Sequence, residues 1–156
     1  MNNDEGTRLK LVAVGSDHAG YALKQAVVDA LEADGYETHD FGSYADDVVD
    51  YPDIARAVAE AVAGGRFEVG IVICGTGIGS TIAANKVRGI RAAACSEPYS
   101  ARMARSHVDA NILGLGGRVL GPGLAVDVAR TFLETEFESG SRHERRVDKI
   151  EPPECR

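Results

Sequence analysis

The stretch IVICGTGIGS, residues 71–80, decides the fold because it joins an apolar strand to a glycine loop. Residues 69–73 (VGIVI) carry no polar side chain, which is typical of a central strand that is buried on both faces of a parallel sheet. Three alternating glycines follow Cys74 at once, and the chain then continues as a predicted helix to about Lys86. Strand, loop and helix in this order predict a right-handed βαβ unit.

The same alternation of short apolar runs and helical patterns extends along the chain. Further strands are predicted at 9–15, 37–41, 90–94 and 112–115, and helices at 21–33, 54–63, 98–106, 124–137 and in the basic segment 142–149. This pattern predicts an α/β fold, namely a single Rossmann-like three-layer α/β/α domain with a five-stranded parallel sheet and a C-terminal helix. We expect the domain to span residues 9–150, between a flexible segment at 1–8 and a tail at 151–156.

Composition places the chain among ordinary globular proteins, with 44% hydrophobic and 26% charged residues out of 156. No apolar run approaches the roughly 20 residues that span a bilayer, and the polar N-terminus lacks the apolar core of a signal peptide. We therefore expect a cytoplasmic protein. The three cysteines are an odd number without a CxxC pair, which argues against a disulfide framework and against a zinc site.

Charge favours a small anionic ligand over a polymer. The net charge of −7 makes nucleic acid or an anionic membrane a poor partner. Residues 142–149 (RHERRVDK) hold four basic and two acidic side chains, so this segment is +2 and the rest of the chain, with 13 basic and 22 acidic residues, is −9. Arg118, Arg142, Arg145 and Arg146 are potential phosphate ligands, although a basic segment read alone is more often a solvated face.

Ligands of open parallel sheets bind at the carboxyl ends of the strands, and polar residues follow the predicted strands here. Asp17 and His18 come after the first strand, where Asp17 either grips a substrate or caps the next helix. Tyr51 lies before the second predicted helix and either faces the cleft or packs beneath it. His107 ends the fourth predicted helix, where it is either a proton donor or a histidine stabilised by the helix dipole.

Cys74 and its loop permit three interpretations. Cys74 is a buried strand-end thiol, or it is a general base whose pKa is lowered by the N–H groups of the loop, which also bind an oxyanion. The third interpretation is a dinucleotide-binding loop, since Gly75, Gly77 and Gly79 approach GxGxxG. Against it, the third glycine comes one position early and the loop follows the third strand. A Walker phosphate loop is excluded, because no Gly-Lys-Ser/Thr closes the motif.

Taken together, the chain resembles the ribose-5-phosphate isomerase B family, within the wider group that includes the galactose-6-phosphate isomerase subunits. The resemblance covers most of the chain from Lys10 to about Ile150. It rests on an ordered set of motifs: GSDHAG at 15–20, DYPD at 50–53, ICGTGIG at 73–79, IAANKVRGIRAA at 82–93, SEPYSA at 96–101 and GGRVLG at 116–121.

The resemblance implies metal-free, cofactor-free interconversion of an aldose phosphate and a ketose phosphate through an enediolate. It implies Cys74 as the base, Thr76 as its assistant and His107 as the acid that opens the sugar ring. The substrate-binding set that it implies is Asp17, His18, Tyr51, Gly75, Gly77, Ile78, Gly79, Arg118, Arg142 and Arg146. Relatives without the cysteine carry a glutamate directly after the glycine loop, where this chain has Ser80.

The resemblance also implies a homodimer or homotetramer whose site lies between subunits. One position departs from the pattern. Family members often carry an asparagine directly after the ring-opening histidine, and here that residue is Val108. Loss of an amide that bonds a sugar hydroxyl changes discrimination between substrates. Ribose 5-phosphate is the expected substrate, and a four- or six-carbon sugar phosphate is the alternative.

Overall fold

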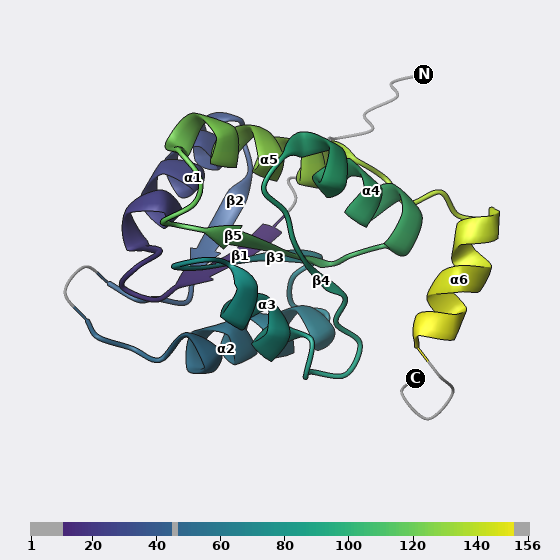
Figure 1. Ribbon diagram of the computed structural model, residues 1–156, viewed down its shortest axis with the longest axis horizontal. Helices are drawn as coiled ribbons and strands as arrows, with labels where there is room; N and C mark the ends of the chain where they lie inside the picture. The colour runs from purple at the N-terminus through teal and green to yellow at the C-terminus, as the bar shows by residue number, and fades with distance from the viewer. Residues whose placement is uncertain (1–10, 45–46, 152–156) are drawn as a thin grey trace, which may run out of the picture.

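A five-stranded parallel sheet forms the centre of the computed structural model, which describes residues 11–44 and 47–151 (Figure 1). The strand order is β2-β1-β3-β5-β4. The strands are β1 (Leu11–Ser16), β2 (Glu37–Asp40), β3 (Val69–Cys74), β4 (Ala92–Ala94) and β5 (Ile112–Gly116). The predicted α/β fold with five parallel strands is confirmed.

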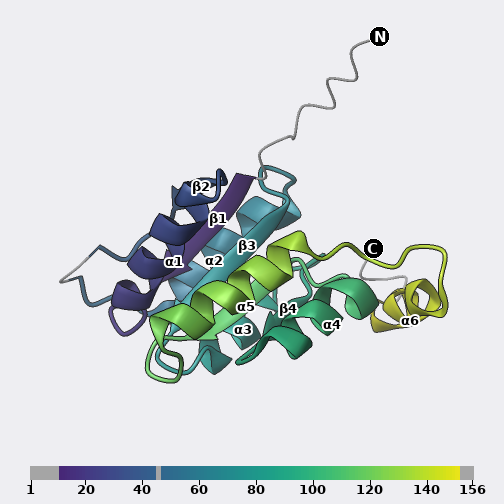
Figure 2. The same ribbon diagram turned by 90° about the horizontal axis from the view of Figure 1, so that it is seen from above.

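Helices cover both faces of the sheet. They are α1 (Tyr21–Ala33), α2 (Tyr51–Ala63), α3 (Ile78–Ala84), α4 (Pro98–Val108), α5 (Pro122–Glu134) and α6 (Arg142–Ile150). Helices α1, α4 and α5 lie over one face, and α2 and α3 lie over the other (Figure 1). Helix α6 lies outside these layers and packs against α4, as the view from above shows (Figure 2). None of the described helices combines the length and hydropathy needed to cross a bilayer.

The hydrophobic core is divided by the sheet into two clusters. One joins β1 and β3 to α1, α4 and α5 and contains Val27 and Phe132, both fully buried. The other lies under α2 and contains Val58 and Phe67. Every residue of β3 is buried, as its apolar sequence predicts. The glycine loop therefore follows a fully buried strand at the centre of the sheet.

Helix and strand boundaries differ from the sequence-based ones at two prolines and at the end of α5, which stops at Glu134 and not at the predicted Phe137. Helix α2 begins at Tyr51, three residues before the predicted start, and α5 begins at Pro122, two residues before it. In both helices a proline occupies the first turn, where its fixed φ favours the helix and its missing N–H costs little. Strand β4 starts at Ala92 because Ile90 closes a turn onto the Val87 carbonyl. The predicted segment 1–8 and the tail beyond residue 151 lie outside the described residues.

The topology fixes where a ligand binds. From β1 the chain moves to one side to form β2, and β3 pairs with β1 on the other side. The carboxyl ends of β1 and β3 are therefore a topological switch point, where open α/β sheets form their binding crevice. The residues that directly follow these two strands are Asp17 and the glycine loop after Cys74.

Candidate active site

Cys74 ends β3 with its thiol buried at the first turn of the glycine loop. The side chain is buried, at 4% exposure, and Sγ accepts a hydrogen bond from the Gly77 N–H at 3.2 Å. The Ser80 hydroxyl also lies 3.3 Å from Sγ and donates to it. The loop thus turns back on the thiol and surrounds the sulfur with hydrogen-bond donors.

These donors change the acidity of the thiol. Burial alone would raise the pKa of Cys74, because an apolar environment disfavours the thiolate. The hydrogen bonds from the Ser80 hydroxyl and from the backbone of Ser80, Thr76 and Gly77 outweigh burial, and the pKa is lowered. A thiol with this property is available as a base nearer neutral pH.

The shape of the loop depends on two of its glycines. Gly77 has φ of 77°, in the left-handed region, and a Cβ at this position would lie 2.8 Å from the Leu115 carbonyl carbon. At Gly79, a Cβ would lie 2.6 Å from the aromatic ring of Tyr51. Tyr51, the first residue of α2, therefore lies directly against the loop. Its side chain is 40% exposed, so the ring borders the crevice and is not buried beneath it.

Arg118 lies on the other side of the loop. Its N–H donates to the Gly75 carbonyl at 2.9 Å, and its Cδ is 3.7 Å from the place that a Gly75 Cβ would take. Gly117 donates in turn to the Cys74 carbonyl at 2.8 Å. The turn after β5 is thereby joined to the loop after β3, which brings a guanidinium side chain to the entrance of the crevice.

Asp17 and His18 follow β1 at the same edge. The Asp17 N–H donates to the Ile73 carbonyl, and its carboxylate accepts the Gly20 N–H at 3.0 Å. The latter contact satisfies one amide at the start of α1, so the capping interpretation of Asp17 has direct support. His18 is exposed. We call this group (Asp17, His18, Tyr51, residues 74–80 and Arg118) the loop edge.

His107 is not part of the loop edge. It lies in the last turn of α4, just before β5 begins at Ile112, whereas Cys74 is paired with Gly116 at the end of β5. With about 3.3 Å per residue, the two ends of β5 are roughly 13 Å apart. Helix α4 runs back along the sheet, so its end lies at the edge opposite to the carboxyl ends of the strands. One chain therefore does not bring His107 to Cys74.

His107 instead forms a cluster with residues near α6. Its ring stacks on that of His143 with centroids 3.9 Å apart and an angle of 8° between the planes. The Glu138 carboxylate is 3.9 Å from Nε2 of His107 and 3.6 Å from Nε2 of His143. Burial and the nearby His107 lower the pKa of His143.

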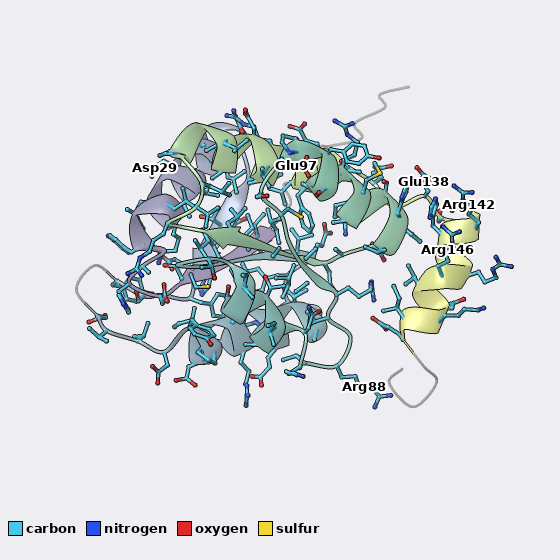
Figure 3. The ribbon with its side chains drawn as sticks, in the orientation of Figure 1. Asp29, Arg88, Glu97, Glu138, Arg142 and Arg146 are labelled. Atoms are coloured by element: carbon cyan, nitrogen blue, oxygen red, sulfur yellow. The ribbon has the colours of Figure 1, made fainter. Side chains whose placement is uncertain are left out.

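Arg142 and Arg146 are exposed on α6 beside this cluster. Figure 3 shows both arginines on α6 together with Glu138, at the far end of the molecule from Asp29 on α1. We call His107, Glu138, Arg142, His143 and Arg146 the α4–α6 corner. The structure thus divides the predicted site residues between two places.

An ionic network fixes the α4–α6 corner to the rest of the fold. Arg91 donates from Nε to the Val108 and Asp109 carbonyls at 3.1 and 2.9 Å and pairs with the Asp109 carboxylate at 3.1 Å. It also pairs with Glu151 at the end of α6. Arg105 pairs with the other carboxylate oxygen of Asp109 at 3.3 Å. The turn after His107 and the end of α6 are held by one arginine.

Two cavities flank these regions. A cavity of about 200 Å³ adjoins the loop edge and is lined by Thr76, Ile78, Cys95 and Gly116, among others. Burial and the carboxylate of Glu97 raise the pKa of Cys95 to about 11, so this second thiol stays protonated. A larger cavity, about 640 Å³, lies beside β4 and includes Val108, but its lining contains none of the predicted site residues.

Sequence analysis missed two functional candidates. Ser80 was considered only as the place of a missing glutamate, although a hydroxyl in the first turn after a glycine loop is a signal for a donor directed back at the loop. His143 was missed because the segment that contains it, residues 142–149, was interpreted only by its net charge. Arg146 follows His143 by three residues and Arg142 by four, a spacing that places the three on one side of a helix.

Comparison with known proteins finds one family and several similar proteins. A model of the family described as Ribose/Galactose Isomerase matches residues 12–150. The chain is 48% identical over 142 residues to ribose-5-phosphate isomerase B of Escherichia coli strain K12, with 91% of this chain and 95% of that protein covered. It is 43% identical over 141 residues to D-erythrulose-4-phosphate isomerase of Pectobacterium atrosepticum, with 89% and 91% covered.

A solved structure shares the fold. The structure of Clostridium thermocellum ribose-5-phosphate isomerase B superposes with a TM-score of 0.87 at 56% sequence identity, and the match covers 90% of this chain and 94% of that one. At this identity and coverage the two chains share the α/β fold.

Proposed function

This chain belongs to the ribose/galactose isomerase family, as a sugar-phosphate isomerase of the ribose-5-phosphate isomerase B type, and we propose that it interconverts ribose 5-phosphate and ribulose 5-phosphate. The observation that carries the proposal is the Cys74 thiol, buried at the switch point of the sheet and hydrogen-bonded by Gly77 and Ser80. Aldose–ketose isomerisation needs one base that removes a proton from one carbon and returns it to the neighbouring carbon.

In the proposed reaction, the Cys74 thiolate removes the proton from C2 of the open-chain aldose. The electron pair forms the C1–C2 double bond of an enediolate whose negative charge lies on O1. A proton then passes from O2 to O1, and the thiol returns its proton to C1 as the C2 carbonyl of the ketose forms. The N–H groups of the loop from Gly75 to Gly79 stabilise the enediolate oxygens, and the Thr76 hydroxyl assists Cys74. Asp17, His18 and Tyr51 border the sugar.

The sugar phosphate must first open its furanose ring, and we propose that His107 supplies the proton for this step. Arg118, Arg142 and Arg146 would bind the phosphate, for which guanidinium groups have the matching geometry. These roles require the loop edge and the α4–α6 corner to face each other.

Two chains would satisfy that requirement. We propose that the loop edge of one subunit and the α4–α6 corner of another form each complete site in a homodimer, or in a tetramer built from such dimers. The support is that His107 precedes the amino end of β5 whereas Cys74 lies at its carboxyl end. Arg142 and Arg146 lie on α6, outside the layers of the sheet (Figure 3). A symmetric dimer repeats such a contact twice and yields two equal sites.

The identity of the sugar is the open part of the proposal. Ribose 5-phosphate is favoured by the similarity to ribose-5-phosphate isomerase B, while Val108 and the relative named for erythrulose 4-phosphate support a four-carbon alternative. Val108 packs against the apolar core and lines the larger cavity, so it offers no hydrogen bond to a hydroxyl.

A panel of four-, five- and six-carbon sugar phosphates, assayed in D2O, tests the proposal. We expect the highest kcat/KM on ribose 5-phosphate and deuterium incorporation at the carbon that receives the proton. A higher kcat/KM on a four- or six-carbon sugar would change the substrate and keep the reaction. Turnover that requires a nicotinamide cofactor would instead support the dinucleotide interpretation of the loop.

A further inference from the structure

The two histidines and the glutamate of the α4–α6 corner also match the ligand set of a transition-metal ion. One ligand atom from each of His107, Glu138 and His143 lies within 4.8 Å of the others. Two imidazoles and one carboxylate are a set that binds Zn²⁺ and leaves a fourth position open. We propose that His107, Glu138 and His143 form a Zn²⁺ site, and that the bound metal inhibits the enzyme.

The backbone holds these ligands in place without a metal. The Glu138 N–H donates to the Ser106 carbonyl at 3.1 Å, directly before His107 on α4. Ser141 caps α6 by accepting the His143 N–H at 3.1 Å, and its hydroxyl donates to the Glu138 carbonyl at 2.6 Å. Glu138 and His143 are therefore fixed to each other and to the turn of α4 that carries His107.

The side chains have the freedom that coordination needs. The His143 side chain is 7% exposed, whereas those of His107 and Glu138 are 36% and 54% exposed. Coordination of one ion through both Nε2 atoms turns the stacked rings out of parallel, and the exposed His107 can make that turn. Zn–N and Zn–O distances of about 2.0–2.2 Å require the three side chains to close by a small movement.

The surroundings select the kind of metal. Arg142 and Arg146 place positive charge beside His143 and only one carboxylate is present, so a hard cation such as Mg²⁺ or Ca²⁺ gains too few oxygen ligands. Zn²⁺, Co²⁺ or Cu²⁺ bind imidazole nitrogen well enough to overcome this charge. The same arginines favour an anionic oxygen as the fourth ligand.

Inhibition follows because the metal occupies the imidazole that opens the sugar ring. This consequence rests on the proposed function, whereas the metal site itself does not. Zn²⁺ is therefore expected to reduce turnover of substrates that form a furanose ring, and EDTA is expected to restore it.

Titration of the metal-free full-length protein with Co²⁺, followed by its visible absorption, tests the site without any substrate. We expect one Co²⁺ per chain, displaced by Zn²⁺. Glu138→Gln should weaken Co²⁺ binding by more than roughly 10–100-fold, which is the cost of losing a residue that only orients a metal ligand. Glu136→Gln, which removes the same charge from an exposed residue two positions away, is the matched control and should bind normally.

Each outcome has a distinct meaning. Absence of Co²⁺ binding, or equal weakening by Glu138→Gln and Glu136→Gln, would overturn the metal site. Binding that depends on Glu138 and leaves ribose 5-phosphate turnover unchanged would keep the site and overturn its inhibitory role. An enzyme inactive on every sugar phosphate but still binding Co²⁺ would refute the proposed function alone.

Discussion

The loop edge and the α4–α6 corner differ in how the chain builds them. At the loop edge, donors come largely from the backbone around one buried thiol, and the central strand β3 holds them in place. At the α4–α6 corner, Arg142 and Arg146 are exposed on a helix at the margin of the fold, and their neighbours are a half-buried and a buried histidine. The first region suits proton transfer between carbon atoms. The second suits opening of the sugar ring and binding of the phosphate. In this account, neither is a complete active site alone.

Removal of the base at the loop edge should have the largest effect. Cys74→Ala is expected to lower kcat by roughly 10²–10⁴-fold, the amount that a general base contributes, with little change in substrate binding. Cys95→Ala, the matched control, removes a buried thiol that stays protonated and should retain kcat within a few-fold. A Cys74→Ala enzyme with near wild-type kcat would remove Cys74 from the mechanism.

The corresponding change at the α4–α6 corner should depend on the substrate. His107→Asn is expected to lower kcat/KM for ribose 5-phosphate by about 10²-fold, the lower end of the range for an acid catalyst. Turnover of erythrulose 4-phosphate should change much less, because this four-carbon ketose has no O5 and its aldose isomer has O4 esterified, so neither forms a furanose ring. Equal losses on the two substrates would argue against a ring-opening role.

The two buried thiols should differ in reactivity. In a Cys155→Ser background, iodoacetamide is expected to modify Cys74 with a pH midpoint below that of an ordinary thiol, since hydrogen bonds lower its pKa. With a pKa of about 11, Cys95 is a thiolate in roughly one molecule in a thousand at pH 8 and should stay unmodified. Mass spectrometry of peptides measures both rates, and faster modification of Cys95 would reverse the assignment.

A smaller effect is expected from the donor that stabilises the Cys74 thiolate. Ser80→Ala removes the hydroxyl 3.3 Å from Sγ, so the pKa of Cys74 should rise and kcat/KM at neutral pH should fall about tenfold. The loss should diminish as pH increases and the thiolate forms again. Ser106→Ala, whose hydroxyl donates to the Arg102 carbonyl within α4, controls for loss of a buried serine. A pH profile that Ser80→Ala leaves unchanged would contradict the role of this hydroxyl.

Much of the fold could be predicted because its periodic patterns are strong. The apolar run of β3 and the helical pattern of α1 are set by local sequence, and α1 was predicted with its observed bounds. The starts of α2 and α5 were misplaced because the apolar pattern begins after Pro52 and Pro122, which lie in the first turn of each helix.

The candidate site was less predictable, because its residues are brought together by topology. That Tyr51 packs on Gly79 depends on how α2 crosses the sheet, and that His107 lies away from Cys74 depends on the direction of α4. Neither contact can be predicted from how far apart these residues lie in the sequence. Ser80 and His143 were missed because each becomes informative only beside its partner, Cys74 for the first and His107 for the second.

The central claim, that two chains share each site, is tested most directly by mixing two defective enzymes. Cys74→Ala and His107→Asn subunits, co-expressed with different tags, form mixed dimers that can be purified and identified by native mass spectrometry. In a mixed dimer, one site receives both defects and the other receives neither. An unfractionated mixture should therefore recover about a quarter of wild-type activity, since about half of its dimers are mixed and each has one intact site of two. Mixed dimers that are as inactive as either parent would place Cys74 and His107 of one chain in the same site and contradict the account.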